Sequence, residues 1–239
     1  MIDLHCHILP AIDDGPPDIE GSLKMVRTAA DDGVTHIVAT PHFLYEEKQK
    51  AEEIEPSLEV LAGKVNKGGI PVTLLRGADI RLSYALLEGI KRKDVPTINK
   101  SRYFLIELPE PIPPNLAKFF SAAEMNGFVA IVTHPERNSS LLASPDKIKV
   151  LRDSGALFQV TAMSVTGEFG GRLKSFCQML FRRGFADFVA SDAHDPFIRK
   201  PGLSKAYREV VGLRGQKEAE TIFFENPAAV IENRAIITG

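Results

Sequence analysis

Seven short apolar segments, each suited to a buried β-strand, recur along the chain and constrain its fold more than any other feature. They span residues 2–8, 35–40, 72–75, 103–106, 129–133, 156–160 and 188–191. The stretches between them have the apolar period of amphipathic helices, and several of these end at a glycine. Alternating strands and helices favour a parallel sheet, and no Gly/Ser-rich or low-complexity linker divides them. We therefore predict a single domain over residues 1–239 with a parallel, barrel-like α/β fold.

Composition narrows the class of partner and the compartment. The net charge of −2 over 239 residues gives no basic face for nucleic acid, so we expect no nucleic-acid partner. No signal-peptide pattern opens the chain, and no apolar run approaches the roughly 20 residues of a membrane span, so we expect no direct membrane insertion. Cys6 and Cys177 lie far apart among apolar residues. We therefore expect reduced thiols in a cytoplasmic protein. The sequence is compatible with an oligomer.

The first predicted strand carries two histidines on one face. Alternate side chains of an extended backbone point to opposite sides, so His5 and His7 point together while Leu4 and Cys6 point into the packing. Two imidazoles that converge in this way suit a divalent metal, although histidine pairs of this kind also occur in ordinary cores.

Most other histidines, and several carboxylates, also follow predicted strands. In parallel α/β barrels the carboxyl ends of the strands open on one mouth, where reactive groups gather. The candidates at these ends are His5, His7, Asp14, His42, Asp79, Glu107, His134, Asp192 and His194. His36 is the one histidine outside this set, and it begins a predicted strand at the opposite end. This clustering predicts a metal centre at the mouth of the barrel.

The mixture of ligand types indicates more than one metal. Five imidazoles and four carboxylates are too many for one four-coordinate zinc, whereas hydrolytic centres with two or three metals use this mixture. Imidazole and carboxylate ligands without thiolate suit Mn, Fe(II) or Zn. Such a centre supplies hydroxide near neutral pH and neutralises phosphoryl charge. Arg137 and Arg199 are candidates for binding phosphate oxygens, with a solvated surface charge as the alternative for each.

The ordered motifs H-x-H, D-D-G, A-T-P-H, L-I-E, T-H-P-E-R and S-D-A-H resemble the polymerase-and-histidinol-phosphatase (PHP) superfamily. More narrowly, they resemble the capsule and exopolysaccharide tyrosine-protein phosphatases of bacteria. The resemblance runs along nearly the whole chain and implies a distorted (β/α)7 barrel of PHP type. It also implies a phosphatase with two to three divalent metals, typically manganese. The implied partner is the tyrosine-phosphorylated tail of a membrane-associated bacterial tyrosine autokinase that controls polysaccharide export.

The resemblance also assigns roles to individual residues. It places His5, His7 and Asp192 on one metal, Asp79 as a bridge to a second metal held by Glu107 and His134, and Asp14, His42 and His194 on a third. It implies catalytic roles for Arg137, Asp192 and His194, and substrate-phosphate contacts for Arg137 and Arg199. The family usually has Glu where this chain has Asp79. A carboxylate that is one methylene shorter bridges two metals only if its loop moves inward.

Four alternatives accompany this interpretation. Cys177 and Arg183 stand at the C-x5-R spacing of cysteine-dependent tyrosine phosphatases, but the residues between them are helix-periodic and lack glycine, so we interpret Cys177 as a core residue.

Three other functions remain open for this chain. They are a phosphatase for histidinol phosphate or another small phosphomonoester, a metal-dependent amidohydrolase, and a non-catalytic metal-binding module. If the substrate is a phosphotyrosine, Phe43, Tyr45 and Phe197 are candidates to pack its phenol ring.

Overall fold

The computed structural model describes residues 1–46 and 48–238 as an α/β fold, which confirms the predicted class. Within these residues it has nine strands: β1 Ile2–Cys6, β2 His36–Ala39, β3 His42–Leu44, β4 Thr73–Arg76, β5 Asp79–Arg81, β6 Tyr103–Glu107, β7 Val129–Thr133, β8 Leu157–Thr161 and β9 Phe188–Ala190. The α-helices of the same residues are α1 Ile19–Asp31, α2 Lys48–Lys67, α3 Tyr84–Arg92, α4 Leu116–Met125, α5 Ser139–Ala143, α6 Asp146–Asp153, α7 Ala162–Thr166, α8 Gly171–Arg182, α9 Ser204–Arg214, α10 Gln216–Glu220 and α11 Asn226–Ile231. Three short helical turns, η1 Ile98–Lys100, η2 Pro135–Arg137 and η3 Thr221–Glu225, complete them.

All strand pairs are parallel, and they form two sheets. One sheet has the order β1-β2-β4 and the other the order β3-β5-β6-β7-β8-β9. The two strands beyond the seven expected are β3 and β5, which follow the ends of the strands expected over residues 35–40 and 72–75. Thr40 and Pro41 separate β2 from β3, and residues 77–78 separate β4 from β5. Proline has no N–H to donate, so the ladder is interrupted at Pro41.

The second interruption depends on a glycine. A Cβ at Gly77 would lie 2.6 Å from Val38 Cγ1 and 3.1 Å from Thr40 Cγ2, so only glycine lets the two chains approach this closely. His42 and Asp79, expected just beyond strand ends, instead begin β3 and β5 and pair with one another in register. The break therefore brings two predicted ligands side by side.

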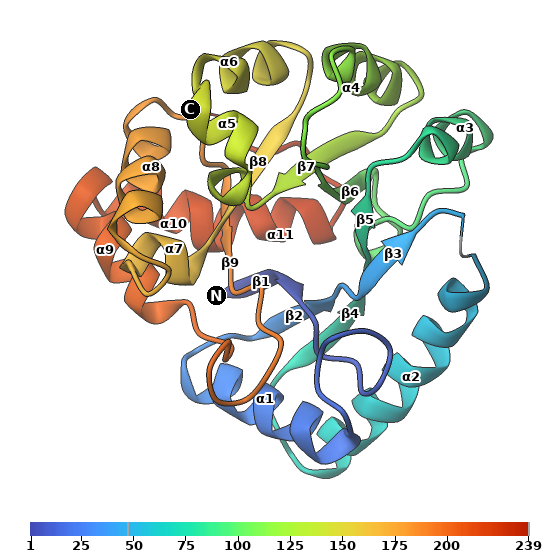
Figure 1. The fold of residues 1–239 in the computed structure, drawn as a ribbon. Helices are drawn as coiled ribbons and strands as arrows, with labels where there is room; N and C mark the ends of the chain where they lie inside the picture. Colours follow the sequence, from blue (N-terminus) through green and yellow to red (C-terminus); the bar gives the residue numbers. More distant parts are fainter. Residues whose placement is uncertain (47, 239) are drawn as a thin grey trace.

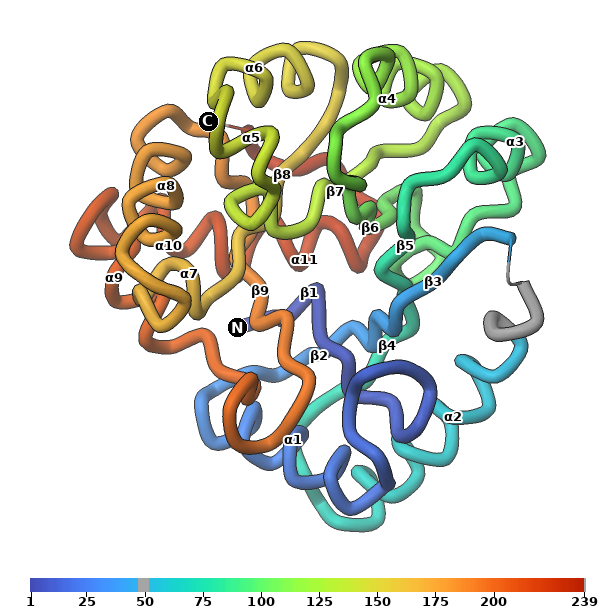
Figure 2. The backbone as a smooth tube through the Cα atoms, in the orientation of Figure 1, coloured from blue at the N-terminus to red at the C-terminus, as the bar shows by residue number. Residues whose placement is uncertain are grey.

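The first and last strands also meet. A parallel bridge joins Cys6 to Ala193, Asp192 N donates to His5 O at 2.9 Å, and His7 N donates to Ala193 O at 2.9 Å. With the chain continuing from β2 into β3 and from β4 into β5, the strands surround a common centre with helices outside (Figure 1). This arrangement is a distorted barrel, and the backbone tube shows the loop after β9 beside the loop after β1 (Figure 2).

Local signals in the sequence account for several helix boundaries. The Asp18 side chain accepts a hydrogen bond from Gly21 N at 2.8 Å and caps the start of α1. Gly33, just after α1, has a φ of 87°, a left-handed conformation that favours glycine. The apolar face of α8, with Phe176, Cys177 and Leu180, is buried in the main core. The caps set where α1 begins and ends, and the buried apolar face holds α8 against the core.

None of the helices among the described residues is both long enough and apolar enough to cross a bilayer.

Candidate metal centre

Most of the nine predicted ligands lie at or beyond the carboxyl ends of strands, His42 and Asp79 begin β3 and β5, and most of the nine converge. Among the described residues, three groups of ligand atoms each lie within 4.8 Å of one another. These groups are His5, His7 and Asp192; His7, Asp14, His42 and His194; and His42, Asp79 and Glu107. His7 and His42 each belong to two groups, so the three groups form one continuous cluster.

The rings of His5 and His7 face each other through the same atom. Their Nε2 atoms are 3.0 Å apart, and both side chains are fully buried. His5 Nδ1 lies 2.9 Å from Gln159 Oε1, and His7 Nδ1 lies 2.6 Å from Asp13 Oδ2. Because both partners are acceptors, each Nδ1 carries the proton, and in the neutral rings both Nε2 atoms present lone pairs. Two lone pairs at this distance repel each other unless a cation lies beside them, so this pair fits a metal ion.

His194 is fixed in the same way. Its Nδ1 donates to the backbone oxygen of Asp192 at 3.0 Å, which leaves its Nε2 facing Asp14 Oδ1 at 3.4 Å. Its ring stacks on that of His7, with the centroids 3.8 Å apart. A ring lone pair that faces a carboxylate oxygen again requires positive charge between them. The tautomers of three histidines therefore point to the same cluster interior.

The Asp79 carboxylate also fits a metal ion, as the His5 and His7 pair and His194 do. Its Oδ1 accepts from Thr133 Oγ1 at 3.2 Å, whereas its Oδ2 has no hydrogen-bond partner although the side chain is fully buried. This Oδ2 lies 3.4 Å from His42 Nδ1 and 3.7 Å from His5 Nε2. A buried carboxylate needs positive charge beside it, which the protonated His42 ring supplies in the metal-free protein and a divalent cation would supply in its place. The shorter Asp79 side chain thus still reaches between the neighbouring groups.

The protonation states also suit metal binding. Burial lowers the pKa of His134 to about 4 and, together with the neighbouring His7, lowers that of His194 to about 4, so both rings are neutral at pH 7. Burial alone would raise the pKa of Asp192, but His5, His134 and Arg199 lower it to about 2. His42 differs, because Asp79 raises the pKa of its ring to about 9 against the effect of burial. A metal that binds His42 must therefore displace a proton.

His134 does not join Asp79 and Glu107 in one group of ligand atoms, although the resemblance implied that it would. It belongs to none of the three groups found among the described residues, and the group that contains Asp79 and Glu107 is completed by His42. Its ring centroid lies 5.9 Å from that of His5, and its backbone is left-handed, with a φ of 33°. The expected pairing of His134 with Asp79 and Glu107 is thus not the one that this geometry favours, and its role as a ligand stays a prediction.

The two predicted phosphate-binding arginines meet at one carboxylate. Arg137 Nη1 donates to Asp192 Oδ2 at 2.5 Å, and Arg199 Nη2 donates to the same oxygen at 2.8 Å. The other oxygen, Oδ1, lies 3.5 Å from His5 Nε2 and 3.6 Å from His7 Nε2. Asp192 therefore separates the imidazole group from two cationic side chains. A small cavity of about 160 Å³ opens beside Arg137 and is lined by Glu107, Leu108, Glu110, Val132, Thr133, His134, Pro135, Arg137 and Asn138.

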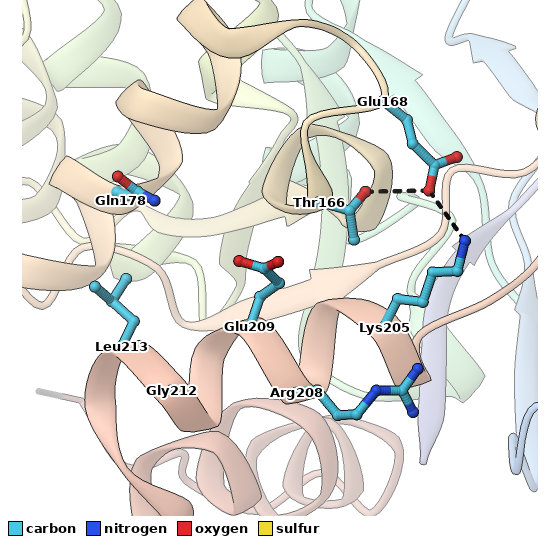
Figure 3. A pocket seen from close by; sticks show the side chains of 8 residues that line it. All are labelled: Thr166, Glu168, Gln178, Lys205, Arg208, Glu209, Gly212 and Leu213. Carbon is cyan, nitrogen blue, oxygen red and sulfur yellow. Dashed lines mark hydrogen bonds and ion pairs between the residues drawn. The ribbon is translucent and has the colours of Figure 1, made fainter.

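A larger cavity lies elsewhere. It has a volume of about 600 Å³ and runs along α9, between this helix and residues of α7 and α8 (Figure 3). None of the predicted ligands lines it, and its charges are of both signs, with Glu168 and Lys205 paired at 3.8 Å. Its size alone therefore gives no reason to place the chemistry there.

Sequence reasoning missed two residues that hold the ligands. Asp13 accepts from the His7 ring and also from His42 N at 2.9 Å and Gly15 N at 3.0 Å, whereas only its neighbour Asp14 in the D-D-G motif was expected at the site. Gln159 orients His5 and is fully buried within β8. A single amide side chain inside an otherwise apolar strand was the available signal, because buried polar groups need partners.

Three expectations about other side chains have clear outcomes. Cys177 is fully buried in α8, and burial raises the pKa of its thiol far above the usual range, so it is not a nucleophile. Phe43 and Tyr45 were wrongly considered for packing a phenol ring, because both are 3% exposed core residues. Phe197 is instead 69% exposed.

Comparison with known proteins agrees with the resemblance seen in the motifs. The chain is 33% identical over 238 residues to the putative tyrosine-protein phosphatase CapC of Staphylococcus aureus, covering 99% of this chain and 93% of that protein. It is 35% identical over 240 residues to the tyrosine-protein phosphatase YwqE of Bacillus subtilis (strain 168), with coverage of 99% and 93%.

Solved structures also match this chain. A chain from the crystal structures of YwqE from Bacillus subtilis and CpsB from Streptococcus pneumoniae, described as unique metal-dependent tyrosine phosphatases, matches with a TM-score of 0.95 and 31% identity, covering 100% of this chain and 97% of that one. A dihydroorotase, with a TM-score of 0.55 and 15% identity over 98% of this chain and 72% of its own, shares the fold alone. The profile of the capsular polysaccharide synthesis family CpsB/CapC matches residues 1–232, and the chain therefore belongs to that family.

Proposed function

We propose that this protein is a metal-dependent phosphatase that hydrolyses phosphotyrosine in proteins. The observation that carries the proposal is the position of Asp192. One of its carboxylate oxygens faces the paired Nε2 atoms of His5 and His7, and the other accepts from Arg137 and Arg199. The candidate metal group and two arginines suited to binding phosphate thus lie on opposite sides of one side chain, which supports the proposal. The names of the relatives support the same activity.

The metal ions, when bound, would supply a hydroxide nucleophile near neutral pH and neutralise charge on the phosphoryl group. His5, His7 and Asp192 would hold one of two to three divalent ions, and the groups around His42 would hold the others. Manganese is the ion we favour from the family resemblance. Iron or zinc also suits imidazole and carboxylate ligands without thiolate.

The protein's own cations would bind the substrate. Arg137 and Arg199 carry planar guanidinium groups that match two oxygens of a phosphate at once. Both now donate to Asp192 Oδ2, so an entering phosphate would compete for donors that already point into the site. Fixed donors of this kind stabilise the charge that develops in the transition state. We assign both arginines to substrate binding, and Arg137 also to transition-state stabilisation.

The chemistry of the leaving group favours tyrosine. A tyrosine phenol has a pKa near 10, far below that of an alcohol, so its oxygen leaves with less help from an acid. The phenol ring also holds the phosphate far from the peptide backbone. This length allows the phosphate to reach groups as deeply buried as His5 and His7, while the peptide stays outside.

The proposed physiological substrate is the tyrosine-phosphorylated tail of a membrane-associated bacterial tyrosine autokinase that controls capsule or exopolysaccharide synthesis. The family description supports the link to capsular polysaccharide. We propose that the phosphatase meets this tail in the cytoplasm, a compartment that keeps free thiols such as those of Cys6 and Cys177 reduced.

One assay compares the candidate functions. The manganese-loaded protein would be given phosphotyrosine peptides, phosphoserine peptides, histidinol phosphate and a chromogenic amide. We expect kcat/KM to be well above the others for phosphotyrosine peptides. Histidinol phosphate as the best substrate would replace the proposal with a small-molecule phosphatase, and turnover of the amide alone would indicate an amidohydrolase. A protein that binds metal but turns over none of these compounds would be a metal-binding module.

A further inference from the structure

The loop after β9 is held in one conformation by Asp195. The Asp195 carboxylate accepts from three successive backbone N–H groups: Phe197 N at 2.7 Å, Ile198 N at 2.6 Å and Arg199 N at 2.9 Å. The loop is closed at its base, where His194 N donates to Arg199 O at 2.9 Å. The tip therefore has little freedom to fold back on the protein.

Two large apolar side chains project from this fixed tip. Phe197 is 69% exposed and Ile198 is 79% exposed. Of the large hydrophobic residues exposed among residues 1–46 and 52–238, these are the only two that are consecutive. Lys24 Nζ of α1 lies 3.9 Å from the centre of the Phe197 ring and helps to hold it. A rigid loop that displays apolar side chains to water suits binding, because it loses little entropy when a ligand covers it.

The tip adjoins the candidate metal centre. Arg199, one residue beyond Ile198, donates from Nη2 to Asp192 Oδ2 at 2.8 Å and to Asp192 O at 3.0 Å. In the backbone view the loop lies beside the loop that follows β1, which carries Asp14 (Figure 2). The pair Phe197 and Ile198, called the apolar edge below, thus stands on the outer side of a phosphate-binding arginine.

We propose that the apolar edge binds an apolar residue next to the phosphotyrosine in the peptide substrate, and so sets a sequence preference. This inference rests on the proposed function. When a phosphate reaches Arg199 and the buried histidines, the phenol ring occupies the entrance, and the neighbouring residues of the peptide lie at the rim. The rim beside Arg199 is the apolar edge. Its partner is therefore a neighbouring side chain and not the phenol ring.

The test compares two phosphotyrosine peptides, one with leucine on both sides of the phosphotyrosine and one with serine there. Wild type and the double variant Phe197→Ser with Ile198→Ser would be assayed on both peptides and on p-nitrophenyl phosphate. Partial burial of two apolar side chains predicts a KM about tenfold lower for the leucine peptide in wild type. We expect the double variant to lose this difference while its kcat stays unchanged. We also expect its turnover of p-nitrophenyl phosphate to equal that of wild type.

The control is Tyr84→Ser, which removes an aromatic side chain that is 96% exposed on α3. It should leave the preference for leucine intact. A wild type with no such preference, or a double variant that keeps it, would overturn the inference alone. An equal loss on p-nitrophenyl phosphate would place the apolar edge against the phenol ring and also overturn it. If wild type hydrolysed p-nitrophenyl phosphate but neither peptide, the proposed function would fall, and this inference with it.

Discussion

Asp13 Oδ2 lies 2.6 Å from His7 Nδ1, and the same oxygen accepts from the backbone N–H of His42 at 2.9 Å. One carboxylate therefore orients the ring of one predicted ligand and the backbone of another. The Asp13 carboxylate also accepts from Gly15 N, which shapes the turn that carries Asp14. These three contacts position His7, His42 and the turn that carries Asp14, three of the four members of the group completed by His194.

Removal of Asp13 should therefore weaken metal binding without removing any predicted ligand. We expect Asp13→Ala to lower the affinity of the apo protein for Mn by about 10- to 100-fold, as is usual when the acceptor behind a ligating histidine is lost. Titration calorimetry would measure this change, and circular dichroism would check the fold. Asp31→Ala, an exposed carboxylate at the end of α1, is the control. Equal affinities in Asp13→Ala and wild type would limit Asp13 to a role in the turn.

Much of this site was predictable from the sequence because barrel strands bring their carboxyl ends together. The positions of His134 and Asp192 directly after strands, and the placement of His5 and His7 on one face of the first strand, follow from the apolar pattern alone. The ends of the second and third strands near residues 40 and 75 were predicted, but the return to strand structure at His42 and Asp79 was not. It depends on how closely two chains approach in space, as the 2.6 Å from a Cβ at Gly77 to Val38 shows.

The residues that orient the ligands were harder to predict from the sequence than the ligands themselves. Asp13 and Gln159 act on histidines through hydrogen bonds whose partners are set by the folded arrangement and not by spacing. Gln159 lies 154 positions from His5 in the sequence. The same holds for Phe43 and Tyr45, whose burial depends on helices that pack over them later in the chain. Residue types at strand ends thus predict the ligands, while the contacts behind them require the fold.

Loss of the Cys177 thiol should leave catalysis largely unchanged. Burial keeps this thiol protonated at neutral pH, and it lies in the helical core of α8. We expect Cys177→Ser to keep most phosphatase activity, and we expect chelators to remove the activity of both proteins. Assays with p-nitrophenyl phosphate before and after chelation would measure this. Activity that resisted chelation but disappeared in a folded serine variant would instead assign the chemistry to the cysteine.

Arg137 should act mainly on bound phosphate. It follows the predicted ligand His134 on the same loop and already donates to Asp192. Loss of one transition-state donor typically costs about 2–4 kcal/mol in kcat/KM, and we expect a loss of this size for Arg137→Ala. Arg137→Lys should recover only part, because an ammonium cannot donate to two oxygens in a fixed fork. Near wild-type kinetics for the alanine variant would remove Arg137 from the site.

Metal binding should release a proton from His42. The pKa of its ring is raised to about 9 by Asp79, so the ring is protonated at pH 7.5 in metal-free protein. A ligating ring must be neutral, so the affinity should fall as the pH drops below about 9 and level off above it. Calorimetry in buffers with different ionisation enthalpies would count the protons. We expect about one proton fewer for His42→Gln, and an unchanged count would place His42 outside the metal groups.

The central claim is that phosphatase activity depends on a centre with several metals built from residues at the strand ends. The most direct measurement is the metal content of protein purified without chelator, taken together with its turnover of p-nitrophenyl phosphate. We predict more than one divalent ion per chain in wild type, and a folded His5→Ala variant with less metal and no turnover. Full activity in wild-type protein that holds one metal or none per chain would contradict the account.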